Sequence, residues 1–310
     1  MLGIKTLAKH KIIPYLAGSR VKMLQKNIFL AMTLLVKDEV DIIEKNILYH
    51  LSQGVDKIIV MDNGSTDGTV AILEKYKKLG KVDYFVNREN GFLQDVWVTR
   101  LIKIAIDKYK ADFVINSDAD EFWVPKYFNL KTMILIESDY DVISVPVRNY
   151  LPPRNLNIKN FNFENYPYYV KKTFGVPPKV IDRNIDDLWL YTYSNKLITS
   201  RKVTKIGFGN DTVKSAKKLK KILTTTIDIY HFPIRNYSHF EHKVINGGKA
   251  LLSNPSKDMG RGWQWRQWYQ IYLGGKLKEQ YIKQTMADKL NYLINLGVIK
   301  KSVPGVLNVF

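Results

Sequence analysis

The residues best suited to chemistry lie in the stretch NSDADEFWVP, residues 116–125. It places Asp118, Asp120 and Glu121 directly after the apolar FVI and directly before the bulky FW. Alternate residues of an extended segment face the same side, so Asp118 and Asp120 can hold one divalent cation between them. Crowded carboxylates are costly unless a cation or hydrogen bonds compensate them. We therefore predict a metal site; the alternative is an acidic turn in which Asp120 or Glu121 caps the next helix.

A second acidic stretch, VMDNGSTDGT, occupies residues 60–69. Asp62 ends an apolar strand, and Gly64 and Gly68 permit tight backbone conformations after it. A carboxylate at such a position can accept hydrogen bonds from a ribose or from an imide N–H. The alternative is a solvated turn between strand and helix, which we favour for Asp67 and not for Asp62.

The elements that must position these groups alternate in type along the chain. The continuous apolar run at 27–36 predicts a strand buried on both faces, and residues 38–54 then repeat apolar side chains at helical spacing. Further strands are predicted at 56–62, 81–87, 111–118 and 140–147, and helices at 66–80, 93–109 and 129–138. Strands and helices that alternate in this way predict an α/β fold with a doubly wound, mostly parallel sheet.

In an open parallel sheet, ligands bind at the carboxyl ends of the strands. Acidic residues fall at three such ends: Asp38 with Glu39, Asp62, and Asp118 with Asp120. Because these ends share one edge, we expect the acidic side chains to converge there.

Beyond residue 150 the pattern loosens. Residues 149–169 are rich in aromatic residues and asparagine and are interrupted by proline, which predicts a long irregular connection or lid. Strand-like pieces follow at 196–206 and 226–232, and a helical tail begins near 236. We predict a basic N-terminal segment at 1–26, a catalytic domain at 27–235 and a helical, aromatic-rich extension at 236–310.

The composition limits the class of protein. A hydrophobic content of 45% supports a packed core, and the lack of cysteine excludes disulfides and thiol catalysis. The net charge of +19, from 48 Lys+Arg against 29 Asp+Glu, favours phosphate-bearing partners such as nucleotides, nucleic acid or anionic lipid. No apolar run reaches the length of a membrane span. We predict a soluble cytoplasmic protein whose basic residues 1–26 attach it to an anionic membrane surface at the cytosolic face.

The stretch TLLVKDEVDIIEKNILYHLSQGVDKIIVMDNGSTDGT, followed by INSDADEFWVP, resembles the nucleotide-sugar-binding half of glycosyltransferase family 2. The resemblance is to the branch whose metal motif runs D-x-D-E-F. It covers about residues 27–148 and continues more faintly through IYHFPIRNYSHFEHKV and GRGWQWRQWY. It implies a GT-A fold, a nucleoside-diphosphate sugar donor such as a UDP-sugar, a Mn²⁺ or Mg²⁺ ion, a glycan or glycolipid acceptor, and transfer with inversion.

The resemblance also implies roles for individual residues. The residues assigned to the donor are Thr33 and Glu39 beside the nucleotide, Asp62 on the base or ribose, Arg100 on a phosphate, and Asp118 on the ribose and the metal. Asp120 is the expected direct metal ligand. Lys37 near a phosphate is weighed against an ordinary solvated lysine.

The sequence departs from the family pattern at the last metal ligand. Relatives in this branch carry Gly-x-His near IGFGNDTV, where this chain has Asp211. Either Asp211 completes the metal site, as an oxygen ligand that Mg²⁺ or Mn²⁺ accepts, or His231 does so. A histidine that follows apolar residues is more often structural.

An inverting transfer needs a carboxylate to take the proton of the acceptor hydroxyl. The candidates for this base are Glu121, Asp186 and Asp187, with Glu164 as a further one. Glu121 can instead brace the metal loop. We expect repulsion among the crowded acids to make an Asp120→Asn variant melt, without metal, at the same temperature or higher.

Two further features allow alternative interpretations. Trp265, Trp268, Tyr269 and Tyr272 recur at helical spacing and are predicted to pack against the catalytic domain, although the tryptophans suit sugar rings or lipid headgroups too. A nucleotidyltransferase fits a similar sheet but needs a Gly-rich basic loop after the first strand, which LLVKDEVD lacks. A nucleic-acid-binding protein explains the charge but not three acidic strand ends, so no nucleic acid is expected.

Overall fold

The computed structural model describes residues 27–87, 94–175, 179, 182–203, 205–215, 218–253, 262–302 and 304–307. The predicted basic segment at 1–26 lies outside these residues, so its membrane attachment stays a prediction. Within the described ranges, no helix combines the length and apolar character needed to cross a bilayer.

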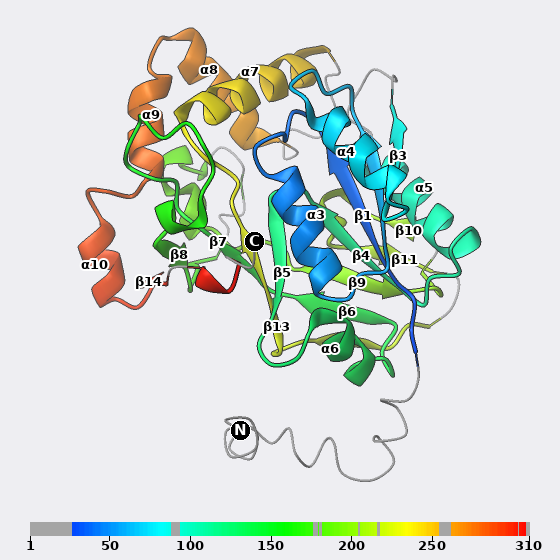
Figure 1. Ribbon diagram of the computed structural model, residues 1–310. Coiled ribbons are helices and arrows are strands. Elements are labelled where there is room, and N and C mark those ends of the chain that lie inside the picture. The colour runs from blue at the N-terminus through cyan, green and yellow to red at the C-terminus, as the bar shows by residue number, and fades with distance from the viewer. Residues whose placement is uncertain are drawn as a thin grey trace.

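A seven-stranded sheet forms the centre of the molecule, with strand order β12-β6-β9-β4-β1-β2-β3 (Figure 1). Its strands are β1 (Leu30–Val36), β2 (Lys57–Asp62), β3 (Val82–Val86), β4 (Phe113–Asp118), β6 (Val142–Val145), β9 (Lys196–Ser200) and β12 (Lys221–Leu223). The neighbours of β1 are β2 and β4, and both pairings are parallel. Only β9 among these strands runs antiparallel to its neighbours, β4 and β6. The predicted mostly parallel α/β sheet is therefore confirmed.

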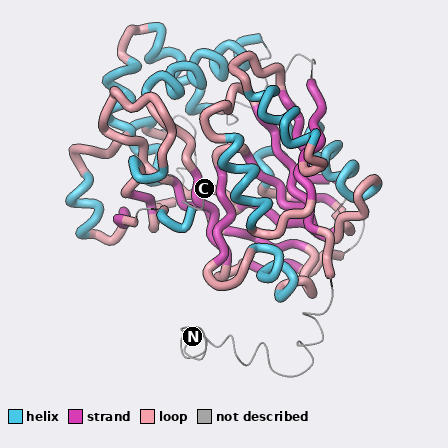
Figure 2. The backbone as a smooth tube through the Cα atoms, in the orientation of Figure 1, coloured by secondary structure: helices cyan, strands magenta, loops and turns pink. Residues whose placement is uncertain are grey.

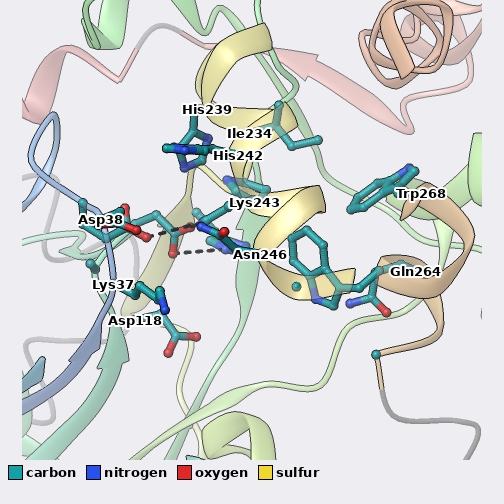
Figure 3. Close-up of a pocket in the computed structure, with 18 of the residues that line it drawn as sticks. Lys37, Asp38, Asp118, Ile234, His239, His242, Lys243, Asn246, Gln264 and Trp268 are labelled. Carbon is teal, nitrogen blue, oxygen red and sulfur yellow. Dashed lines mark hydrogen bonds and ion pairs between the residues drawn. The ribbon is translucent and has the colours of Figure 1, made fainter. Parts of the chain in front are cut away.

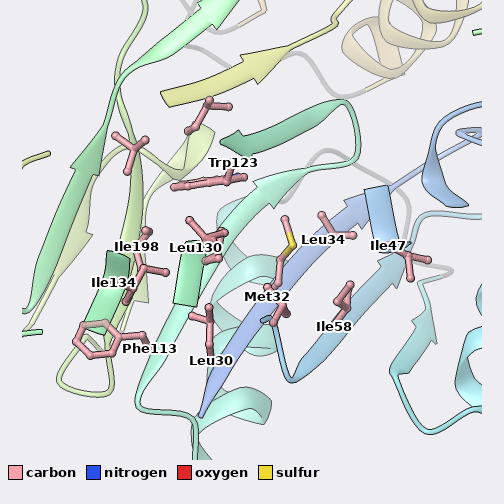
Figure 4. Close-up of a cluster of buried hydrophobic side chains, with 14 of the residues drawn as sticks. Leu30, Met32, Leu34, Ile47, Ile58, Phe113, Trp123, Leu130, Ile134 and Ile198 are labelled. Carbon is pink, nitrogen blue, oxygen red and sulfur yellow. The ribbon is translucent and has the colours of Figure 1, made fainter. Parts of the chain in front are cut away.

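Helices cover both faces of this sheet because alternate side chains of each buried strand point to opposite sides. One face packs against α3 (Ile43–Ser52), α4 (Thr69–Lys78) and α6 (Leu130–Ile136), and the other against α5 (Gln94–Asp107). Leu30, Met32 and Leu34 of β1 belong to the first core, which Figure 4 shows around Trp123. Ala31 belongs to the second core. The strand is thus buried on both faces, as its continuous apolar run predicts.

The predicted strand at 140–147 is in fact two strands that join different sheets. β6 ends at Val145, and β7 (Val147–Asn149) lies in a three-stranded sheet with β5 (Glu121–Pro125) and β13 (Ile227–His231). Pro146 separates them, and proline has no N–H to continue a ladder. The second sheet carries Glu121 and His231 opposite each other, so it links the acidic stretch to the C-terminal part of the chain.

The C-terminal helices form their own hydrophobic cluster. They are α7 (Tyr237–Ser253), α8 (Trp263–Leu273), α9 (Leu277–Gln284) and α10 (Leu290–Asn295), and they lie beside the sheet in Figures 1 and 2. The cluster also includes Leu151, Val170 and Trp189, which precede the predicted domain boundary at 236. Trp268 is 2% exposed and lies in this cluster, in agreement with the packing predicted for the aromatic tail.

Two glycines let α7 and α8 approach closely. A Cβ added to Gly248 would lie 2.2 Å from Cγ of Tyr269, and one added to Gly247 would lie 3.2 Å from Cδ2 of Trp265. The pair therefore places α8 directly against α7, where a larger residue would force the helices apart.

His50 is a buried link between α3 and the second sheet. Its side chain is 0% exposed, and its Nδ1 contacts the carbonyl oxygen of Asn46 at 2.9 Å. Because a carbonyl can only accept, Nδ1 carries the hydrogen, and Nε2 accepts the Trp123 N–H at 3.2 Å. Burial lowers the pKa of His50 to about 3, so the ring is neutral at neutral pH.

A His50→Gln substitution should make folding stability less sensitive to acid. Between the ordinary pKa of 6.5 and about 3, the unfolded chain binds a proton that folded His50 cannot, so stability falls as pH falls. One such group contributes a slope of about 1.4 kcal/mol per pH unit. Glutamine keeps a donor and an acceptor but does not titrate. Urea unfolding of both proteins from pH 7 to pH 4.5 measures the slopes, and equal slopes would contradict the assignment.

Candidate active site

A cavity of about 1470 Å³ opens at the carboxyl ends of β1 and β4. Its walls come from the end of β1 and the loop after it (residues 35–41), the end of β4 and the loop after it (residues 118–120), and helices α7 and α8. Residues 156–159 and several residues between 183 and 194 complete the walls. Figure 3 shows Lys243 and Asn246 of α7 facing Asp38 and Asp118, with Trp268 of α8 on the far side. The predicted convergence of acidic strand ends thus coincides with a cavity, although its far wall comes from the C-terminal helices.

Asp120 and His231 face each other on the cavity wall. Nε2 of His231 lies 3.5 Å from Oδ1 of Asp120. The other ring nitrogen, Nδ1, contacts Oδ1 of Asn149 at 2.6 Å, and an amide oxygen can only accept. In the neutral ring Nε2 therefore presents its lone pair toward the carboxylate, which is the orientation of a metal-ligating histidine.

Lys243 and Arg235 surround the same carboxylate. Lys243 Nζ is 2.8 Å from Oδ2 of Asp120 and 3.6 Å from Oε1 of Glu39. Arg235 Nη1 is 4.0 Å from Oδ2 of Asp120. Burial alone would raise the pKa of Asp120, but the charges of Lys243 and Arg235 hold this pKa well below its usual value. Asp120 is therefore ionised and ready to bind a cation.

Arg235 has a fully buried side chain that binds two acids from the loop after β1. Its Nη2 is 2.6 Å from Oε2 of Glu39, and its Nε is 2.6 Å from Oδ2 of Asp41. Burial raises the pKa of Glu39, and Arg235 and Lys243 oppose this rise. The arginine therefore fixes the loop that carries the predicted donor residue Glu39.

Glu121 braces the end of β4. Its Oε2 accepts the backbone N–H of Asp118 at 3.1 Å, and its Oε1 is 3.0 Å from Nζ of Lys196. Lys196 also pairs with Asp118 at 2.7 Å. Burial raises the pKa of Glu121, with the Lys196 charge opposing the rise. Glu121 does not line the cavity, so its contacts suit the bracing role better than that of a base.

The carboxylate of Asp62 is hydrogen-bonded within its own loop. Its carboxylate accepts the backbone N–H groups of Gly64 and Ser65 at 3.2–3.3 Å, and its exposed fraction is 1%. Asn63, the next residue, lines the cavity instead. Asp38 accepts the Thr66 N–H at 2.7 Å, which joins this loop to the loop after β1.

The structure places the remaining predicted residues away from the cavity wall. Thr33 is buried in β1, and its hydroxyl donates to Oδ1 of Asn116 at 3.1 Å. Arg100 is exposed on α5, and Asp211 follows the short 3₁₀ helix Phe208–Asn210. The predicted bases Asp186 and Asp187 pair with Lys283 and Lys289 at 2.8 Å, and Glu164 is exposed. None of these side chains lines the cavity.

Sequence reasoning missed Arg235 and Lys243, both in HFPIRNYSHFEHK, residues 231–243. No spacing rule singles out these two residues, because ion pairs to residues more than 100 positions away leave no local pattern.

Comparison of the sequence with models of protein families identifies the family of the chain. The model of glycosyl transferase family 2 matches residues 36–195, which is more than half of the chain. The chain belongs to glycosyl transferase family 2. Family membership agrees with the assignment made from the sequence and favours a glycosyltransferase over the nucleotidyltransferase alternative. The match ends before Arg235 and Lys243, so the family model does not cover these two residues.

Solved structures and curated proteins add little to the family assignment. S. aureus TarS in complex with UDP aligns at 13% identity and a TM-score of 0.36, over 71% of this chain and 66% of that chain. The glucosyl-3-phosphoglycerate synthase of Mycobacterium tuberculosis, in complex with Mn²⁺, UDP and glucosyl-3-phosphoglycerate, aligns at 14% identity and a TM-score of 0.32, over 60% and 62%. This chain thus spans less than two thirds of these solved chains. No curated protein matches the sequence.

Proposed function

We propose that this enzyme transfers a sugar from a nucleoside-diphosphate sugar, such as a UDP-sugar, to a hydroxyl group of a glycan or glycolipid, with inversion and with Mn²⁺ or Mg²⁺. The observation that carries the proposal is the pair formed by Asp120 and His231 on the wall of the large cavity. A carboxylate oxygen of Asp120 and Nε2 of His231 face each other in this pair. Both residues line the cavity at the strand ends, where α/β sheets bind ligands.

The donor set fits a divalent cation. Among the described residues, no group of three or more histidine and acidic side chains is arranged to hold a metal. Mg²⁺ sites of this kind commonly use one or two carboxylates together with phosphates of the substrate, so a pair of protein ligands suffices. Asp120 and His231 would hold the ion, with Asp118 beside them. A bound ion would neutralise charge on the leaving diphosphate. Asp211 remains a proposed metal ligand, although the described structure gives it no hydrogen bond or ion pair with Asp120 or His231.

Basic residues of the cavity support a phosphate-bearing donor. Lys243 faces the cavity from α7, and Lys37 lines it from the loop after β1. Positive groups fixed beside a leaving diphosphate stabilise the charge that develops as the glycosidic bond breaks. Glu39 would sit beside the nucleotide, held by Arg235.

The volume of the cavity favours two substrates. Small-molecule sites usually measure about 300–1,000 Å³, whereas this cavity encloses about 1470 Å³. The acidic end suits the donor and its cation. Trp265 of α8 also lines the cavity, and its half-buried ring offers a face to a sugar acceptor.

The donor class can be tested with a panel of nucleotide sugars and Mn²⁺. We expect one nucleoside diphosphate to raise the melting temperature and its sugar form to be hydrolysed slowly; at 100 times Kd, stabilisation reaches about 2.7 kcal/mol. Chelation of the metal should abolish most of the effect. If no nucleotide stabilises the protein with either Mn²⁺ or Mg²⁺, the proposed donor class is wrong.

A further inference from the structure

Arg183 is a cationic side chain of the cavity that pairs with no carboxylate of the described residues. It lies just before the 3₁₀ helix Ile185–Leu190 and lines the cavity. Its Nε is buried without a hydrogen-bond partner, and in the described part of the chain no carboxylate lies within ion-pair distance of it. A guanidinium taken out of water without an acceptor is costly, so this arrangement suits a ligand that supplies one.

The nearest acids in sequence do not neutralise Arg183. Asp186 pairs with Lys283, and Asp187 pairs with Lys289, both at 2.8 Å. These ion pairs connect the 3₁₀ helix to the C-terminal helices. Neither acid is therefore available to Arg183, whose guanidinium is positioned by its aromatic neighbour. The cationic site is therefore built into the fold and is not a by-product of a neighbouring ion pair.

Packing of Arg183 comes from Trp263 of α8. The guanidinium carbon lies 5.6 Å from the centre of the Trp263 ring, and the ring of Tyr191 lies 6.1 Å from that of Trp263. Stacking on an aromatic face holds the planar guanidinium while leaving its N–H groups free to bind an oxyanion. Trp265, which is half-buried, also lines the cavity and offers a face for a sugar ring.

We propose that Arg183 and Trp263 form an acceptor subsite for a saccharide that carries an oxyanion, either a phosphate ester or a carboxylate. The fork of N–H groups in arginine matches both groups in a bidentate manner. This inference rests on the proposed glycosyl transfer, and it specifies the acceptor: a charged glycan would be bound in preference to its neutral counterpart.

The test uses the full chain saturated with UDP and Mn²⁺, so that the donor end is occupied. Calorimetric titrations with glucose 6-phosphate, glucuronate and glucose then compare phosphate, carboxylate and neutral probes. We expect the wild type to bind at least one anionic probe about tenfold more tightly than glucose, because only an anion forms charge-assisted hydrogen bonds with the guanidinium. Arg183→Gln should remove this preference, and Arg183→Lys should retain part of it.

Lys159 provides a matched control, because it is an exposed lysine that lines the same cavity. Lys159→Gln removes the same charge and should leave the preference for the anionic probe intact. Equal losses in the Arg183 and Lys159 variants would show a general effect of charge and overturn the subsite. Normal UDP binding without any preference for an anionic probe would also overturn it. Failure to bind UDP would instead refute the proposed donor.

Discussion

Replacing Asp120 by asparagine should reduce sugar transfer by about 10²–10³-fold, the usual cost of losing one electrostatic contact to the reacting charges. Asparagine keeps the size of the side chain but removes the negative charge that a hard cation requires. The structure adds that His231 alone would then face the ion. Mn²⁺ titration by calorimetry should show weaker binding in the same preparation, and excess Mn²⁺ should restore little activity.

The stability of this variant should fall, which corrects the expectation from sequence. Crowded carboxylates suggested that Asp120→Asn would melt at the same temperature or higher. In the structure the neighbours that lower the pKa of Asp120 are cations, chiefly Lys243. Losing this charge should cost roughly 1–3 kcal/mol. Because the folded pKa is depressed, the contribution is present at neutral pH and is lost only as pH falls below the ordinary value of 3.8.

Both a metal ligand and a structural residue at position 120 would therefore lower the melting temperature when replaced. A measurement of Mn²⁺ binding distinguishes the two roles. Asp83→Asn is a matched control, since Asp83 pairs with Lys57 at 2.9 Å and with Lys108 at 2.8 Å on β3 and does not line the cavity. It should lose stability and keep full Mn²⁺ affinity and transfer. An Asp120→Asn protein that is destabilised yet binds Mn²⁺ and transfers normally would refute the metal site.

Replacing Arg235 by leucine should cost about 3–5 kcal/mol of folding stability, because it leaves the buried carboxylate of Glu39 and the half-buried one of Asp41 without their partner. Glu39 and Asp41 each lie 2.6 Å from this guanidinium. Arg235→Lys should recover part of the loss, since lysine keeps the charge but not the planar fork. Urea unfolding at pH 7 measures the difference, and a loss within 1 kcal/mol would contradict the role.

The dependence on pH makes this prediction sharper. Burial already raises the pKa of Glu39, and removing Arg235 removes a charge that opposes the rise. A raised folded pKa means that the folded variant binds a proton which the unfolded chain has lost, so lowering the pH toward the ordinary value of 4.5 should reduce the defect. Arg148→Leu is the control: Arg148 pairs with Asp228 at 2.9 Å but is 29% exposed, so its loss should cost at most about 1 kcal/mol.

The sequence predicted the sheet well because its signals are local. The strands at 57–62 and 113–118 and the helix at 94–107 each repeat their apolar residues at the spacing of one element. The sequence predicted the sheet less well where consecutive residues join different sheets and where strands pair over a long separation in the chain. Pro146 divides one apolar run between two sheets, and β9 enters antiparallel beside β4 from 78 or more residues away.

The sequence predicted the part of the candidate site that lies at the strand ends, but not the contacts made by residues distant in the chain. The position of Asp118 and Asp120 at a strand end follows from the parallel pattern, and both line the cavity. The loss of Thr33 from the site could not be foreseen, because its partner Asn116 lies 83 residues further along. Asp186 looked free in the sequence for the same reason: Lys283, its partner, lies 97 residues away on α9.

The long separation between Glu39 and Arg235 has a consequence for the chain as it leaves the ribosome. These partners are 196 positions apart, so at 5–20 residues per second the acid waits about 10–40 s for its cation. Lys243 reaches Asp120 from 123 positions away, later still in synthesis. An incomplete chain would therefore present a strand-end cluster of uncompensated negative charge. Nascent chains that stop before residue 235 should consequently be poor enzymes and ready substrates for proteolysis, so that transfer activity begins only when the C-terminal helices are in place.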